Sequence, residues 1–167
     1  MKICAHLVDI HNRDIYPAIV SVLKGKIDTI ERTGAAPDMY IMPGLIDAHI
    51  HIESSMVTPG AFAMAAVRHG TTGVVSDPHE IANVLGNRGV RFMINDACKV
   101  PLKFWFGAPS CVPATGFETN GATLSHVEIK DLLELTEIKY LSEMMNFPGV
   151  IQGDKEVILK MDIARKL

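Results

Sequence analysis

The stretch Pro43–Glu53, with the sequence PGLIDAHIHIE, carries the strongest structural signal in the chain. A proline–glycine turn precedes apolar, β-branched residues, so we predict a strand over Leu45–His51. Side chains alternate across a strand, which places Asp47, His49 and His51 on one face. Two imidazoles two residues apart can bind one metal ion. The motif therefore predicts a metal site, and a strand with one polar, solvated face is the alternative that it leaves open.

Three further strand–helix units follow this strand. Their predicted strands start near residues 71, 102 and 138, and the last helical pattern runs from Asp154 to the end. Strands that alternate with helices indicate an α/β fold with a parallel sheet. A complete (β/α)8 barrel has roughly 250 residues. Four units within residues 43–167 therefore predict the first half of such a barrel. A compact doubly wound domain is the alternative, and a chain that ends on an uncapped helix disfavours it.

Capping residues mark the expected helix boundaries. Thr58 offers an N-cap before Pro59, and Gly70 ends the helix that follows. Ser125 and Glu128 have the spacing of a capping box at the start of a later helix.

The first 42 residues have a different pattern, with short apolar segments separated by polar turns. The predicted strands cover Ile3–Val8, Ala18–Leu23 and Ile27–Ile30. About three antiparallel strands form only a marginal core by themselves. Thr33–Asp38 contains a glycine and a proline and is expected to be a linker. We therefore expect two domains, residues 1–42 and residues 43–167.

Composition and charge argue against several classes of function. Lys+Arg 16 against Asp+Glu 19 gives a net charge of −3, which argues against nucleic-acid binding. The 48% hydrophobic content excludes a disordered chain. The longest clean apolar run, Ala61–Val67, is too short for a membrane span, and Asp9 comes too early for a signal peptide. Three widely spaced cysteines without a C-x-x-C pair favour a reduced, cytoplasmic protein.

Candidate site residues also follow the other predicted strands, whose carboxyl ends open onto one face of a barrel. Glu143 follows the fourth strand and can bridge two divalent ions; the alternative is an ordinary exposed glutamate. His79 follows the second strand and can contact substrate or a metal-bound water; the alternative is that Asp77 caps the next turn and His79 is surface. Nothing near Cys111 would lower the pKa of its thiol, so we interpret it as packing or pocket wall, with Glu118 as a weaker pocket candidate.

Four longer blocks carry a resemblance to a known family. They are His51–Pro59 (HIESSMVTP), Gly70–Gly86 (GTTGVVSDPHEIANVLG), Phe106–Ala122 (FGAPSCVPATGFETNGA) and Tyr140–Ile151 (YLSEMMNFPGVI). In this order and at these intervals the blocks resemble the adenine deaminases of bacteria and archaea, within the amidohydrolase superfamily. Other amidohydrolases share only the H-x-H portion.

The resemblance implies an amidohydrolase (β/α)8 barrel with a β-sandwich built from both chain ends. It implies hydrolysis of adenine to hypoxanthine and ammonia by hydroxide that a divalent metal centre supplies. The implied metal ligands are His49, His51 and Glu143, with Glu143 as the bridging carboxylate, and His79 and Glu80 line the substrate pocket. The implied centre is binuclear and holds manganese or iron. The implied partners are a purine base and other copies of the enzyme, with no nucleic acid or membrane.

Family members run to several hundred residues, so the resemblance implies that this chain corresponds to their N-terminal portion. The general acid–base residue is then expected on later strands, and we expect little deaminase activity from the isolated chain. Two other interpretations stay open. One is a non-catalytic remnant or interaction module that binds metal weakly or associates with a partner. The other is a different metal-dependent amidohydrolase, which the SCVPAT and EMMNFPG blocks disfavour.

Overall fold

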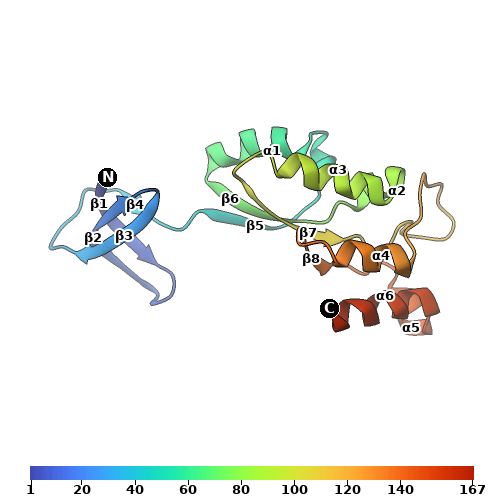
Figure 1. Ribbon diagram of the computed structural model, residues 1–167. Coiled ribbons are helices and arrows are strands. Elements are labelled where there is room, and N and C mark those ends of the chain that lie inside the picture. The colour runs from blue at the N-terminus through green and yellow to red at the C-terminus, as the bar shows by residue number, and fades with distance from the viewer. The chain divides into compact units, whose positions relative to one another are not determined.

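The computed structural model describes residues 1–167, and its contacts divide the chain into two compact units, Met1–Gly44 and Leu45–Leu167 (Figure 1). None of its helices combines the length and the apolar character that crossing a bilayer requires.

The first unit contains one four-stranded sheet in the order β3-β2-β1-β4. Its strands are β1 (Lys2–Asp9), β2 (Asp14–Leu23), β3 (Lys26–Arg32) and β4 (Tyr40–Ile41). The first three strands pair antiparallel, as predicted, and β4 pairs parallel with β1. Ala5 and Ala18 face each other across β1 and β2, and both are buried. Two residues are too few to show a periodic pattern, which explains why β4 was not predicted.

The second unit is built on a parallel sheet, as the alternation of strands and helices predicted. Its strands are β5 (Leu45–Ile50), β6 (Thr71–Ser76), β7 (Lys103–Ala108) and β8 (Ile138–Leu141), and they lie side by side in chain order. A doubly wound sheet reverses its strand order at a switch point. This sheet contains no such reversal, which disfavours the doubly wound alternative.

Helices connect and follow these strands. They are α1 (Pro59–Ala66), α2 (His79–Leu85), α3 (Asn87–Ala97), α4 (His126–Leu133), α5 (Phe147–Gln152) and α6 (Lys155–Lys166), with 3-10 turns η1 (Ile52–Ser55) and η2 (Val67–His69). Figure 1 shows α1 and α3 along the same side of the sheet. Neither α2 nor α5 was predicted, because each spans about two turns and shows no clear apolar period.

The hydrophobic core of this unit lies between the sheet and its helices. Val74 of β6 and Phe106 of β7 are at most 1% exposed, and they pack in one cluster with Val90 of α3 and Ile129 of α4. Burying side chains of this size contributes about 1.5–3 kcal/mol each. The core therefore fixes the strands on which the candidate site residues stand.

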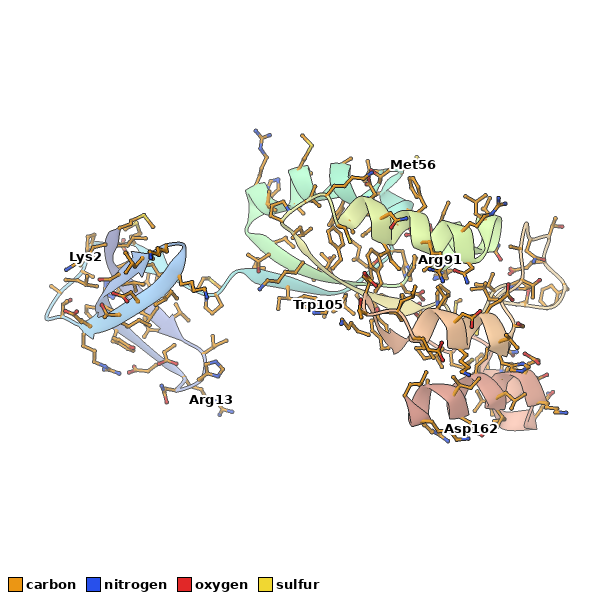
Figure 2. The ribbon with its side chains drawn as sticks, viewed as in Figure 1. Lys2, Arg13, Met56, Arg91, Trp105 and Asp162 are labelled. Carbon is orange, nitrogen blue, oxygen red and sulfur yellow. The ribbon has the colours of Figure 1, made fainter.

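Two glycines shape the opposite side of the sheet. A Cβ atom on Gly73 would overlap the ring of Trp105, and one on Gly107 would overlap the side chains of Tyr140 and Ser142. Figure 2 shows Trp105 on the side of the sheet away from α1 and α3. The glycines thus leave room for the rings of Trp105 and Tyr140 on this side of the sheet.

The helix starts match the expected caps in different ways. Glu128 Oε2 accepts the backbone N–H of Ser125 at 2.8 Å, which confirms the capping box of α4. Thr58 occupies the N-cap position of α1, but its side chain makes no cap bond to the helix. Instead, Asp96 of α3 accepts the Gly60 N–H at 2.8 Å, and this bond lowers the pKa of Asp96. A carboxylate from a neighbouring helix therefore replaces the local cap, which sequence spacing alone does not reveal.

Candidate metal centre

The carboxyl ends of three parallel strands bring the candidate ligands together. His49 lies in β5 and His51 directly follows it, Asp77 directly follows β6, and Glu143 follows β8. Because parallel strands end at the same edge of a sheet, these side chains converge although they lie far apart in sequence. Ile50 and Ile52 point the other way and pack in or against the core.

Three of these side chains form a nearly equilateral triangle of donor atoms. The His49 Nε2 and His51 Nε2 atoms are 3.1 Å apart, and Glu143 Oε1 lies 3.5 Å from the first and 3.4 Å from the second. Ligands at about 2.0–2.2 Å from one tetrahedral ion stand about 3.3–3.6 Å from one another, which matches two of the three separations, and the third is slightly shorter. The donor set therefore fits a divalent metal ion, and it joins the residues that the sequence predicted.

A neighbouring backbone group orients one of the imidazoles. The Asp77 carbonyl oxygen lies 2.8 Å from His51 Nδ1, where it accepts the ring N–H. This bond fixes the tautomer of His51 and leaves its Nε2 lone pair directed at the triangle. The side chain of His51 is 21% exposed, against 61% for His49, so His51 is the more firmly held of the two.

Asp77 lies beside the donor triangle, and the sequence left open that it caps the turn after β6. The N-cap of α2 is Pro78, and no side chain caps that helix. Instead, Asp77 Oδ2 lies 3.2 Å from His79 Nδ1, and this hydrogen bond raises the pKa of His79. Its Oδ1 is buried without any hydrogen-bond partner. A second group of donor atoms comes from His51, Asp77, His79 and Glu143. One donor atom of each residue lies within 4.8 Å of the others.

The expected alternation of β5 breaks at Asp47. The pairing of β5 with β6 is irregular between Asp47 and Ile50, and Asp47 pairs with Val74, which is buried in the core. Its Oδ1 accepts the backbone N–H of His49 at 3.2 Å. Ala48, which was expected on the opposite face, lines the same small cavity as His49. The strand irregularity therefore corrects the prediction that Asp47 shares the face of the two histidines.

Tyr140 of β8 also borders this region. It lines a cavity of about 120 Å³ together with His49, Asp77 and Glu143. Burial, reinforced by the charges of Asp77 and Glu143, raises the pKa of Tyr140 to about 12. The phenol therefore stays protonated at neutral pH and can donate a hydrogen bond in the site. Tyr140 begins the YLSEMMNFPGVI block, but no role was predicted for it from the sequence, since a tyrosine in a short strand looks like core.

The candidate pocket residues lie around a cavity next to the metal triangle. His79, Glu80, Cys111 and Glu118 line a space of about 250 Å³, with Asn83 and Ala114 completing the wall. Glu80 Oε1 accepts the Ser54 hydroxyl at 2.5 Å, and Glu118 Oε1 accepts the Ala114 N–H at 2.6 Å. The two carboxylates are thus held in place, and the structure brings together all four residues that the sequence associated with a pocket.

Glu53 links the 3-10 turn η1 to helix α2. Its Oε1 accepts the Ile81 N–H at 3.2 Å, its Oε2 is buried without a partner, and burial raises its pKa. Glu53 therefore ties the turn after β5 to α2, which carries His79 and Glu80.

The class of protein follows from these features together with comparisons to known proteins. A sequence model described as the amidohydrolase family matches residues 40–167, and the chain belongs to this family. The family implies a divalent metal, and the clustered histidines and carboxylates offer a place for one.

Particular relatives agree with the resemblance predicted from the sequence blocks. The chain is 57% identical over 167 residues to a protein named adenine deaminase from Sulfurovum sp. (strain NBC37-1), covering 100% of this chain and 31% of the relative. It is 54% identical to a protein of the same name from Salinibacter ruber, over 98% of this chain and 30% of the relative. A third adenine deaminase, from Methanothermobacter thermautotrophicus, is 50% identical over 99% of this chain. The chain spans about 30% of the length of the curated relatives it matches.

Proposed function

We propose that this chain forms part of a metal-dependent adenine deaminase, which converts adenine and water to hypoxanthine and ammonia. The observation that carries the proposal is the triangle of donor atoms formed by His49, His51 and Glu143. The relatives named adenine deaminase supply the substrate.

In the proposed reaction, an oxygen from water bonds to C6 of the purine and the bond from C6 to the amino nitrogen breaks. A divalent ion, when bound, lowers the pKa of water and so supplies a nucleophile at neutral pH. His49 and His51 hold the ion through their Nε2 atoms and Glu143 through a carboxylate oxygen. Tyr140 and the walls of the adjoining cavity, which His79 and Glu80 line, hold the base. The residue that moves the protons is proposed to lie outside residues 1–167.

We propose manganese or iron in a binuclear arrangement. Two donor groups overlap at His51 and Glu143, one completed by His49 and the other by Asp77 and His79. A carboxylate has two oxygens and can serve both groups. The unpartnered Asp77 Oδ1 supports the second position, since a buried carboxylate oxygen needs a hydrogen-bond donor or a cation as a partner.

The strand order is consistent with the fold that this function implies. We propose that residues 43–167 form the first four units of a (β/α)8 barrel and that residues 1–42 contribute strands to a β-sandwich. Support comes from the sequential order of the parallel strands. We also propose that the protein forms a homo-oligomer and acts in adenine catabolism. We propose a cytoplasmic location, which the three widely spaced cysteines support.

A chimera tests this function. Residues 1–167 of this chain replace the matching segment of the Sulfurovum relative, which is 57% identical over that segment. We expect the purified, manganese-loaded chimera to release ammonia from adenine and to lose this activity with His49→Ala. A folded chimera that binds manganese but leaves adenine unchanged, while the unmodified relative deaminates it, would contradict the proposed substrate.

A further inference from the structure

Helix α6 buries a lysine that the proposed chemistry does not use. Lys160 is only 8% exposed, and its Nζ donates a hydrogen bond to the backbone carbonyl of Ser110 at 2.9 Å. Lysine is among the residues least often buried, because its ammonium group loses hydration. Burial accordingly lowers the pKa of Lys160. The free-energy cost of burying this ammonium group indicates that Lys160 has a specific role.

The residue that Lys160 contacts is also bonded to the backbone of Glu143, whose side chain is the candidate bridging carboxylate. Ser110 is 2% exposed, and its hydroxyl donates to the backbone carbonyl of Glu143. One serine thus accepts a hydrogen bond from α6 through its carbonyl and donates one to Glu143 through its side chain. The path from Lys160 to Glu143 consists of two hydrogen bonds and a single intervening residue.

Neighbouring bonds hold the rest of the Glu143 segment against the same strand end. The Ser142 N–H donates to the Ala108 carbonyl at 2.9 Å, and the Asn146 N–H donates to Cys111 Sγ at 3.3 Å. The segment that carries Glu143 is therefore held on both sides by residues 108–111. Lys160 is the group that fixes this short stretch to α6.

We propose that Lys160 is a positioning residue for Glu143, acting through Ser110 to hold the carboxylate at the metal triangle. This inference rests on the proposed metal site and adds a residue from outside it. Lys160 does not touch the ion. It restrains the backbone that sets where Glu143 Oε1 lies, 3.4–3.5 Å from the two imidazole nitrogens. Groups that orient metal ligands change metal affinity when they are removed.

The test measures manganese binding to the 167-residue chain by electron paramagnetic resonance. Lys160→Met should weaken the affinity about tenfold, at the lower end of the range for groups that orient ligands. Lys160→Arg, which keeps the charge and the donors, should restore most of it. Lys166→Met removes the same charge from an exposed position on the same helix and should change nothing. Ser110→Ala removes the second bond of the path and should match Lys160→Met.

A second variant, in which Glu143 is already replaced, separates the positioning of Glu143 from a general effect on stability. In a Glu143→Gln chain, adding Lys160→Met should cause no further loss of manganese affinity, because the lysine acts through the carboxylate. An equal tenfold loss in both backgrounds, or no loss in the unaltered background, would overturn the inference. Should Lys160→Met fail to fold by circular dichroism, Ser110→Ala is compared in the same two backgrounds. Failure of the unaltered chain to bind manganese would instead overturn the proposed metal site itself.

Discussion

The Nε2 atoms of His49 and His51 lie 3.1 Å apart at the carboxyl end of β5. In the absence of an ion, one ring must donate to the other at this distance. With an ion bound, both Nε2 atoms act as acceptors, and each ring carries its proton on Nδ1. His51 already has this tautomer, because its Nδ1 donates to the Asp77 carbonyl. His51 is therefore already held in the tautomer that leaves its Nε2 lone pair available to an ion.

His49→Ala should remove metal binding with little effect on folding. His49 supplies one of three donors, and its side chain is 61% exposed, so little packing is lost. We expect manganese affinity to fall by at least about 100-fold, since groups that only orient ligands already account for 10–100-fold. Equilibrium dialysis measures the affinity, and His69→Ala, at an exposed position in η2, is the matched control. Unchanged manganese binding by the His49 variant would contradict the assignment of His49 as a ligand.

Asp77→Asn should separate metal binding from stability. The substitution keeps the size of the side chain and removes a buried carboxylate that has an unpartnered oxygen. We expect the free energy of unfolding of the metal-free chain to fall by about 1 kcal/mol, because the substitution removes the charge from the hydrogen bond to His79 and still leaves a buried polar atom without a partner. The stabilisation that added manganese gives should decrease. Urea unfolding with and without manganese checks both signs, and undiminished stabilisation by manganese would exclude Asp77 from the metal centre.

Gly107→Ala should destabilise the parallel sheet. A Cβ atom there overlaps Tyr140 and Ser142, which are held in β8 and at its end. We expect a loss of about 1–3 kcal/mol in the free energy of unfolding, as for other overpacked sites. Gly116→Ala is the matched control, because an added Cβ meets nothing within 4 Å there. Urea denaturation compares the two variants, and equal stabilities would show that the glycine is not required for close packing.

Glu156→Gln should make the free energy of unfolding depend less on pH in the acidic range. Glu156 accepts hydrogen bonds from the backbone and the ring of His126 at 3.2 and 2.8 Å, and these bonds lower its pKa below the ordinary 4.5. A carboxylate with a lowered pKa contributes stability above its unfolded pKa and loses it as the pH falls through its folded pKa. Urea titrations between pH 6 and about 3 measure the slope. A slope unchanged by the substitution would show that the contact between α4 and α6 is not stabilising.

Local sequence was sufficient for the parallel sheet and for the ligand triangle. Apolar runs and helical periods placed β5 to β8, and the rule that parallel strands end at one edge brought His49, His51 and Glu143 together. The same rule applied to Asp77, but judged from the local sequence alone a cap of the following turn was the simpler interpretation. Its contact with His79 and its unpartnered oxygen depend on the three-dimensional packing of β6 against α2.

Features that depend on partners distant in sequence were not predictable. Asp96 replaces Thr58 as the cap of α1 because α3 lies beside that helix end. Lys160 has the spacing of an ordinary residue on an amphipathic helix, and only the position of Ser110 shows that its ammonium group is buried and bonded. The irregular pairing of β5, which takes Asp47 away from the histidines, likewise depends on the register with β6.

The central claim is that His49, His51 and Glu143 hold one divalent ion between them. The most direct test is anomalous diffraction from crystals of this chain grown with manganese. The account predicts a single strong peak, or one of two adjacent peaks, within bonding distance of the two Nε2 atoms and of a Glu143 oxygen. A peak on other residues, or a manganese-free triangle in crystals that bind manganese elsewhere, would contradict it.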